Sequence, residues 1–468
     1  MFDVVVIGAG PAGVIATIRA AELGARTALV TSGAFGGMAA NDGPVPVRVL
    51  AHAARLMREA RQLGQYGVAV SEPALDYERL LARGREVVRD VRLHSSLRQQ
   101  VDALGATVHE DAGPARFSDP HTIETESGLR LEGEKIILCT GGVSQRLPIP
   151  GFEWTSTHSD AWRLTSLPPS MLIVGGGATG LQVASIFHAF GTRVQLFEAA
   201  PRILATEDVE VAAAIAAAFR ESGMVVKEGF GRIESFEKTA AGVRMIFSSG
   251  GARQAVEATL AVVAVGWVAD TERLRLAAAG VESTPRGFVK VDEYLRTSAA
   301  HVFAAGDVTG RVMLAPPALQ DGFVAGTNAV RGPTMPTGDP RPIPAGGFTD
   351  PEYAHVGLTE EKARETHDVV VASVHFDSTT RTIIDGHEFG FCKLVVDRRT
   401  HQILGCHVVG EQAVEITQVA AVAMAGAMRV EDVSHVPLSY PTYTEILALV
   451  AAEAARRLDV NVSLQAHG

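Results

Sequence analysis

The chain has 468 residues, of which 47% are hydrophobic and 20% are charged, and this balance predicts a globular protein of about three domains. The formal net charge of −11 and the lack of any Lys- or Arg-rich run argue against nucleic acid or an anionic membrane as a partner. No apolar run is long enough to span a bilayer, and a first strand that begins near Phe2 leaves no room for a signal peptide.

The three cysteines, Cys139, Cys392 and Cys406, lie far apart in the sequence. They form no C-x-x-C pair and have no zinc-type spacing, so we expect neither a metal site nor a disulfide framework. The sequence predicts that they are small buried hydrophobic residues in a cytoplasmic protein.

Near the N-terminus, we expect an apolar strand at Val4–Ile7, a glycine turn, a helix to Leu23 and a second strand at Thr27–Val30. The turn has the pattern G-x-G-x-x-G, formed by Gly8, Gly10 and Gly13. The first glycine permits the tight turn, the second lets a pyrophosphate approach the backbone, and the third lets helix and strand pack closely. The phosphates then lie at the helix N-terminus, where the amides and the helix dipole favour an anion.

The same arrangement recurs in the middle of the chain. A strand at Met171–Val174 precedes a glycine turn, a helix through Phe190 and a strand at Val194–Phe197. The second turn is formed by Gly175, Gly177 and Gly180. Glu198 then ends the strand, where an acid can accept hydrogen bonds from a ribose 2′-hydroxyl and repel a 2′-phosphate. We therefore expect NADH to be preferred over NADPH, although Arg202 nearby could bind a 2′-phosphate.

Beyond residue 200, helical and strand patterns alternate, with a helix expected at Val209–Gly223 and a buried strand at Thr259–Val265. From about residue 340 the pattern is α+β, which predicts a separate third domain. Its clearest elements are two strands and two helices, at Phe391–Val396, Ile403–Val409, Gln412–Ala427 and Thr444–Leu458.

Further motifs follow in order along nearly the whole chain. They are Gly36-Gly37, Thr140-Gly141-Gly142, Ala264-Val265-Gly266, Ala305-Gly306-Asp307, and Tyr440-Pro441-Thr442 with Glu445. Together with the two glycine turns, the series resembles the pyridine nucleotide–disulfide oxidoreductases, the family of dihydrolipoamide dehydrogenase, glutathione reductase, mercuric reductase and soluble transhydrogenase. The resemblance implies an α/β fold with two Rossmann-like dinucleotide-binding domains, one for FAD and one for NAD, and an α+β dimerisation domain.

The resemblance also implies domain boundaries and binding residues. The FAD domain would span 1–150 and 273–338, the NAD domain 151–272 and the dimerisation domain 340–468. The implied FAD site comprises Gly8, Gly10, Gly13, Thr31, Gly37, Thr140, Gly141, Gly306 and Asp307, with Asp307 on the ribityl chain and Thr31 in place of a ribose-binding acid. The implied NAD site comprises Gly175, Gly177, Gly180, Glu198 and Gly266.

The chain departs from the family where the chemistry takes place. The family segment G-G-x-C-x-N-x-G-C-x-P-x-K corresponds to residues 36–48, in which both cysteines and the lysine are replaced. The replacements in this and other family positions are Ala39 and Pro44 for the cysteines, Arg48 for the lysine near flavin N5, Gln182 for its glutamate partner, Ala178 for a gating tyrosine, and Tyr440 for the histidine base. Disulfide exchange needs a thiolate pair, so these positions predict that no dithiol chemistry takes place.

The leading hypothesis is an FAD-dependent oxidoreductase that passes hydride from NADH through the flavin to a small acceptor such as a quinone. Arg48, Gln182, Tyr440 and Glu445 are its candidate catalytic residues, with Arg48 facing Gln182. A soluble pyridine nucleotide transhydrogenase and a catalytically degenerate NADH-sensing flavoprotein stay open as alternatives.

By resemblance the protein is a homodimer in which Tyr440 and Glu445 face the flavin of the partner subunit. An apolar helical face recurs at Leu447, Val450, Ala451 and Ala454. The spacing alone fits either a dimer interface or core packing within the domain.

Overall fold

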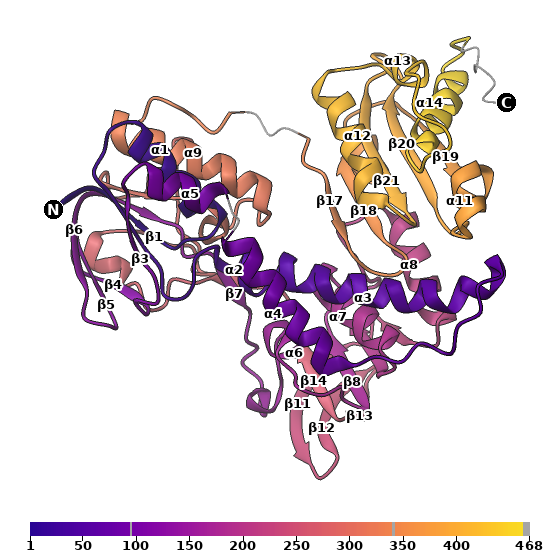
Figure 1. The fold of residues 1–468 in the computed structure, drawn as a ribbon, viewed down its shortest axis with the longest axis horizontal. Coiled ribbons are helices and arrows are strands. Elements are labelled where there is room, and N and C mark those ends of the chain that lie inside the picture. The colour runs from indigo at the N-terminus through magenta and orange to yellow at the C-terminus, as the bar shows by residue number, and fades with distance from the viewer. Residues whose placement is uncertain (94–95, 339–341, 462–468) are drawn as a thin grey trace.

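The computed structural model describes residues 1–93, 96–338 and 342–461, which form an N-terminal, a central and a C-terminal unit around separate sheets (Figure 1). The N-terminal unit contains a parallel sheet in the order β3-β2-β1-β6, with β16 beside the end of β6 and antiparallel β5 and β4 beside its start. Its strands are β1 (Phe2–Ile7), β2 (Thr27–Val30), β3 (Thr107–His109), β4 (Ala115–Asp119), β5 (Thr122–Thr125), β6 (Arg130–Leu138) and β16 (Val302–Ala304). Because β16 pairs with β6, the chain returns to its first sheet after it has formed the central unit.

The helices of the N-terminal unit pack in two different places. Helices α1 and α9 pack together beside the parallel sheet, whereas α3 extends away and packs on α7 of the central unit (Figure 1). These helices are α1 (Pro11–Glu22), α2 (Gly37–Asn41), α3 (Pro44–Gln62), α4 (Tyr77–Leu93), α5 (Ser96–Ala103) and α9 (Ala315–Arg331). The long helix α3 therefore connects the glycine-turn region of the first unit to the rest of the molecule.

The central unit repeats the first architecture. Its parallel sheet has the order β10-β9-β8-β14, beside an antiparallel sheet β11-β12-β13, and the short pair β7–β15 links it to the first unit. Its elements are β7 (Gly142–Ser144), α6 (His158–Trp162), β8 (Ser170–Val174), α7 (Ala178–Ala189), β9 (Arg193–Glu198), α8 (Val209–Glu221), β10 (Val225–Glu228), β11 (Arg232–Thr239), β12 (Gly242–Ser249), β13 (Ala252–Ala258), β14 (Leu260–Val263) and β15 (Trp267–Ala269). Every residue of β8 is buried, as expected for a parallel strand covered on both faces.

The C-terminal unit is an antiparallel sheet in the order β17-β18-β21-β20-β19, covered by α12 and α14 (Figure 1). Its elements are β17 (Ala345–Gly347), β18 (Tyr353–Gly357), α10 (Glu360–Arg364), β19 (Val369–His375), α11 (Thr380–Asp385), β20 (Phe391–Asp397), β21 (Ile403–Val409), α12 (Ala413–Ala425), α13 (Val430–Ser434) and α14 (Glu445–Arg457). The predicted start of this domain at residue 340 lies outside the described residues. The strands and helices expected from the sequence lie within two residues of the observed bounds.

Two sequence expectations are resolved by the packing. The apolar face of α14, at Leu447, Val450, Ala451 and Ala454, is buried inside its own unit, so it is core and not a dimer surface. All three cysteines are buried, as predicted. The sequence did not show, however, that Cys392 and Cys406 come together on neighbouring strands, with their sulfur atoms 3.9 Å apart.

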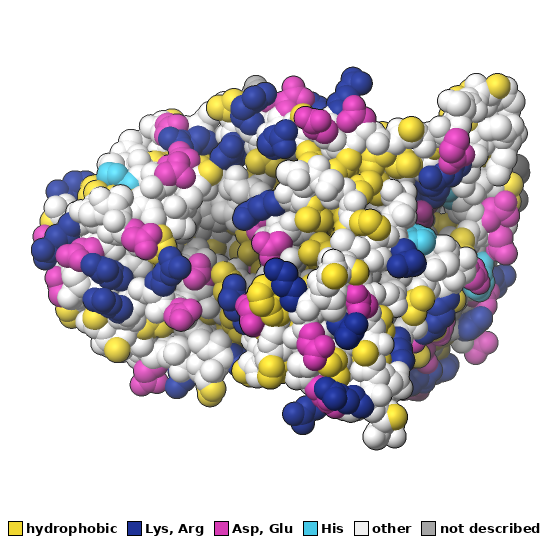
Figure 2. Space-filling model, turned by 90° about the horizontal axis from the view of Figure 1, so that it is seen from below, with side chains coloured by type: hydrophobic (Ala, Val, Ile, Leu, Met, Phe, Trp, Pro, Cys, Tyr) yellow, Lys and Arg dark blue, Asp and Glu magenta, His cyan; other side chains and the backbone are white. Residues whose placement is uncertain are grey.

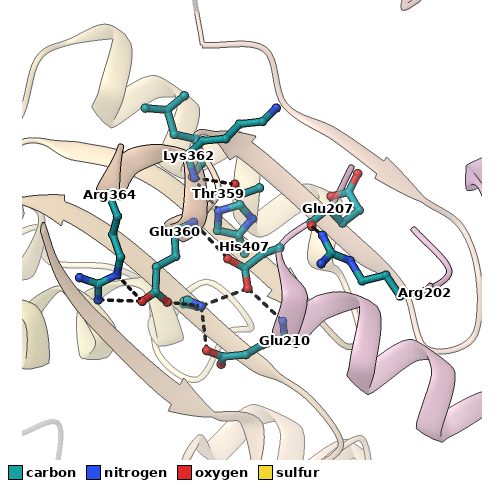
Figure 3. A network of polar contacts seen from close by, with 11 residues as sticks. Arg202, Glu207, Glu210, Thr359, Glu360, Lys362, Arg364 and His407 are labelled. Atoms are coloured by element: carbon teal, nitrogen blue, oxygen red, sulfur yellow. Dashed lines mark hydrogen bonds and ion pairs between the residues drawn. The ribbon is translucent and has the colours of Figure 1, made fainter. Parts of the chain in front are cut away.

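A buried ion network joins the central and C-terminal units. The ammonium of Lys393 on β20 lies 3.0 Å from Asp208, which caps α8, and 2.8 Å from both Glu210 and Glu360. Figure 3 shows the carboxylates of Glu210 and Glu360 turned toward each other across this contact, with Arg364 behind Glu360. Burial opposes the charge of Lys393, but hydrogen bonds to these carboxylates outweigh it and raise the pKa of the ammonium.

Candidate functional site

The first glycine turn has the geometry that a pyrophosphate site needs. A Cβ on Gly8 would lie 2.2 Å from the Cys139 carbonyl oxygen, and one on Gly13 would lie 1.8 Å from the Gly8 oxygen, so only glycine fits at both positions. Above Gly10, by contrast, nothing lies within 4 Å of where a Cβ would be. The first and third glycines therefore hold strand and helix together, while the second leaves the backbone open to a ligand.

The second turn repeats this pattern. A Cβ on Gly175 would lie 2.3 Å from the Ala264 oxygen and one on Gly180 would lie 1.9 Å from the Gly175 oxygen, whereas the space above Gly177 is open. The helices that follow the two turns, α1 and α7, have no side-chain cap and no acid in their first turn. Their first amides are therefore available to an anion at both turns.

The carboxylate of Glu198 lies at the second turn. It accepts hydrogen bonds of 2.6 Å from the amides of Gly176 and Ala200, which fix it at the end of β9. The guanidinium of Arg202 donates to the carbonyls of Ala205 and Glu207 in its own loop (Figure 3). Arg202, which was the argument against NADH preference, therefore makes hydrogen bonds within its own loop.

The remaining residues expected at the FAD site surround the first turn. Gly37 packs so close to the turn that a Cβ on it would lie 2.6 Å from the Gly10 Cα. Gly306 begins a short 3-10 helix, η4 (Gly306–Thr309), against α1, where a Cβ would lie 3.0 Å from the Ala12 Cβ. Thr31, in contrast, is buried at the end of β2 and its backbone bonds to His109 and Ala112.

Asp307 and the turn at Thr140 complete this region. Asp307 lies half-buried on η4, burial raises the pKa of its carboxyl, and no hydrogen bond to that carboxyl comes from the described residues. A polar partner such as a ribityl hydroxyl would satisfy it. Thr140 donates to the Asp270 carbonyl at 2.8 Å, and Gly141 accepts from the Asp270 amide at 3.1 Å. Gly266 in turn accepts from the Gln145 amide at 2.9 Å.

The segment that departs from the family forms the junction of α2 and α3. The Asn41 amide donates to the carbonyls of Phe35 and Gly37 at 3.1 and 2.8 Å, which closes this segment into a compact turn. Ala39 lies on α2 and Pro44 is the first residue of α3, where a proline needs no amide partner. None of the cysteines lies in this turn.

The surroundings of Arg48 differ from the expectation. Its guanidinium lies 3.6 Å from the centre of the Phe348 ring and 3.9 Å from the carboxylate of Glu352, both near β17 and β18. Gln182 instead donates to the Ala178 carbonyl of its own helix at 3.0 Å. No hydrogen bond between Arg48 and Gln182 is present among the described residues; Arg48 instead contacts Phe348 and Glu352.

A polar cavity of about 280 Å³ lies beside Arg48, between α3, α7 and the start of the C-terminal unit. Arg58 and Arg55 on α3 contact Glu411 here at 2.6 and 3.0 Å. Burial, reinforced by Glu411 and a further glutamate, raises the pKa of Glu352 to about 7, while Arg48 and Arg55 oppose the shift. This carboxyl lies 3.9 Å from the guanidinium of Arg48.

Tyr440 and Glu445 converge on a residue that the sequence analysis did not single out. The Tyr440 hydroxyl donates to the Thr380 hydroxyl at 3.0 Å, and Glu445 accepts from the Thr380 amide at 2.9 Å. Thr380 begins α11, and neither it nor Phe348 and Glu352 belongs to a motif that would have identified it.

Arg48 and Tyr440 lie at opposite ends of α3 within one chain. Tyr66, just beyond the C-terminal end of α3, donates to the Ile384 carbonyl of α11, whereas Arg48 is in the second turn of α3. A helix of this length spans about 28 Å. Tyr440 therefore does not share a site with Arg48 of the same chain.

The comparisons with known proteins show the family of this chain. Residues 2–322 match the model of the pyridine nucleotide-disulphide oxidoreductases, and residues 343–451 match their dimerisation domain. The chain therefore belongs to the pyridine nucleotide-disulphide oxidoreductase family. Its fold is the mixed α/β fold of the flavoprotein disulfide reductases.

Individual relatives extend over almost the whole chain. It is 34% identical to a dihydrolipoyl dehydrogenase from Thermus scotoductus, covering 98% of this chain and 99% of that protein. It is 29% identical to a mercuric reductase from Lysinibacillus sphaericus, covering 96% and 82%. The structure is similar to that of the HOCl-induced flavoprotein disulfide reductase RclA from Escherichia coli, with a TM-score of 0.85, 27% identity and coverage of 96% and 99%. Among the described residues, no helix is long and apolar enough to cross a membrane.

Proposed function

We propose that this protein is an FAD-dependent NADH:acceptor oxidoreductase that works without a redox disulfide and reduces a small planar acceptor, of which a quinone is the best example. The observation that carries the proposal is the α2–α3 junction, where Ala39 and Pro44 stand at the positions of the family cysteines, beside Arg48. The overall reaction balances as NADH + H⁺ + quinone → NAD⁺ + hydroquinone.

The cofactor assignments rest on the two turns. The open space above Gly10 and the carboxyl of Asp307 fit FAD, and the open space above Gly177 with Glu198 fits NADH. Bound FAD would supply the chemistry, because it accepts hydride from NADH and passes two electrons to the acceptor. The position of Glu198, and the hydrogen bonds that engage Arg202 in its own loop, support NADH over NADPH.

The chain itself supplies charge, space and a proton. The guanidinium of Arg48 cannot lose its proton, so it can stabilise an oxyanion that develops on the acceptor. Ala39 and Pro44 leave a small apolar wall, which suits an aromatic ring. The phenol of Tyr440, oriented by Thr380, is a group of suitable chemistry to donate a proton to a quinone oxygen.

The distance along α3 supports a homodimer with shared sites. Because Tyr440 does not share a site with Arg48 of its own chain, it would act on the site of the second chain of a two-fold dimer. The match of residues 343–451 to the dimerisation domain supports the same arrangement.

Steady-state turnover with NADH tests the proposal. We expect rapid reduction of a benzoquinone, slow reduction of thio-NADP, and a loss of quinone turnover in Tyr440→Phe. Efficient thio-NADP reduction with poor quinone turnover would replace the proposal by a transhydrogenase. Bleaching of the flavin by NADH without turnover of any acceptor would indicate a sensor.

A further inference from the structure

An apolar groove of about 630 Å³ runs between α3 and α4, starting at Pro44. The lining residues of α3 recur at helical spacing, and those of α4 are three and four positions apart. One face of each helix therefore lines the groove. The lining residues are Pro44, Val45, Arg48, Val49, His52, Ala53, Leu56, Leu80, Arg83 and Val87. This volume is within the usual range for a small-molecule site.

The polar side chains that line the groove are two arginines and a histidine, so none of them carries a negative charge. Arg48, His52 and Arg83 are its only polar lining residues among those described, and no acid lines it. Figure 2 shows hydrophobic side chains gathered over the middle of the underside of the molecule, with side chains of both charges around them. A neutral apolar ligand would add no new partner to Arg48 or Arg83, whereas an anionic ligand could form charge-assisted hydrogen bonds with both.

The two guanidinium groups are available to a ligand. Arg48 lies 3.9 Å from Glu352, a separation longer than a hydrogen bond. Arg83 contacts Glu86 at 2.6 Å, but both side chains are about half exposed, at 60% and 47%, and such a surface pair contributes little free energy. A carboxylate or sulfonate can therefore compete for Arg83 at small cost.

We propose that this groove binds the electron acceptor and selects an anionic one, namely a quinone or similar aromatic ring that carries a carboxylate on its side chain. The ring lies at the Pro44 and Arg48 end, and the apolar side chain runs along the helices so that its carboxylate meets Arg83 and His52. The inference rests on the proposed function for the reaction, since Pro44 and Arg48 belong to both sites.

Binding of two matched probes to the FAD-loaded protein tests the groove without turnover. 4-(2-Naphthyl)butanoate and its amide carry the same ring on the same side chain, so their main difference is the charge at the end of that chain. We expect the carboxylate probe to bind about tenfold more tightly, the usual advantage of a charge-assisted hydrogen bond. Arg83→Gln should remove most of this advantage and leave binding of the amide probe unchanged, and Arg85→Gln, an exposed residue of the same helix outside the groove, should change neither.

Equal affinity for the two probes would overturn the proposal, as would an advantage that survives Arg83→Gln. Failure of both probes to bind would also overturn it, and would indicate that a second copy of the chain covers the groove.

Turnover separates this inference from the function on which it rests. Three benzoquinones with the same ring and a side chain ending in a carboxylate, an amide or an ammonium should be reduced with kcat/KM in that descending order. If all three quinones are reduced equally well, the proposed selectivity for an anionic acceptor is wrong, but the proposed quinone reductase function is retained. If the carboxylate probe binds through Arg83 but no quinone is reduced, the groove is a binding site for an anionic ligand and the proposed function is wrong.

Discussion

Lys393 provides the sharpest test of how the units are held together. Its side chain is 2% exposed and lies within hydrogen-bonding distance of three carboxylates, of which Asp208 is as deeply buried as Lys393 itself. Lys393→Met keeps the volume of the side chain but leaves Asp208 as a buried charge without its cation. Removal of one partner of a buried ion pair destabilises a protein by about 3–5 kcal/mol. We expect a loss of this size in the free energy of unfolding.

Urea unfolding of the FAD-loaded protein, followed by circular dichroism and flavin fluorescence, measures this loss. The matched control is Lys290→Met, because Lys290 makes a 3.0 Å pair with Glu282 in which both side chains are more than half exposed. Such a pair contributes at most about 1 kcal/mol. Adding Asp208→Asn to Lys393→Met should recover part of the loss, since it removes the uncompensated charge. A Lys393→Met protein no less stable than Lys290→Met would refute the reasoning.

Three further predictions concern the site. The folded-state pKa of Glu352, about 7, lies above the ordinary value of 4.5, so the free energy of unfolding of the natural protein falls as pH rises between these two values. The Glu352→Gln protein lacks this loss, so its stability relative to the natural protein should rise by up to about 3 kcal/mol between pH 4.5 and 8. A difference in stability that does not change with pH would contradict this. Arg48→Met should lower the reduction potential of bound FAD, because it removes a positive charge from the proposed site, while Arg61→Met at the far end of α3 should leave the potential unchanged; the 44% exposure of Arg48 and the nearby Glu352 keep the effect well below the ~4 kcal/mol of a unit charge at 4 Å. The value of kcat/KM should be higher for NADH than for NADPH, and Glu198→Ala should narrow the ratio; an equal value for NADPH in the natural protein would refute the assignment.

The local part of the architecture was predictable from the sequence. The glycine turns and the strands on either side of them depend on residues close in the chain, so spacing and hydrophobic pattern were sufficient. The steric contacts at Gly8 and Gly13 and the open space at Gly10 agree with the roles that the pattern predicted.

The surroundings of Arg48 and Tyr440 were not predictable in the same way. Glu352 lies some 300 positions from Arg48 and in no recognised motif, and the expected partner Gln182 bonds instead within its own helix. Thr380 reaches Tyr440 only because α11 folds back beside it. The closeness of Cys392 and Cys406 likewise arises from strand pairing across a turn. Such contacts depend on tertiary packing, for which the sequence carries no periodic signal.

The central claim is that electrons pass to the acceptor without a thiol pair, and an anaerobic titration of the FAD-loaded protein with NADH tests it most directly. Cys139, Cys392 and Cys406 are buried and none of them belongs to the α2–α3 junction, so the flavin should be the only centre that accepts electrons. We predict that reduction ends after two electrons for each FAD, with no long-wavelength band from a thiolate beside the flavin. Uptake of four electrons with such a band would contradict the account.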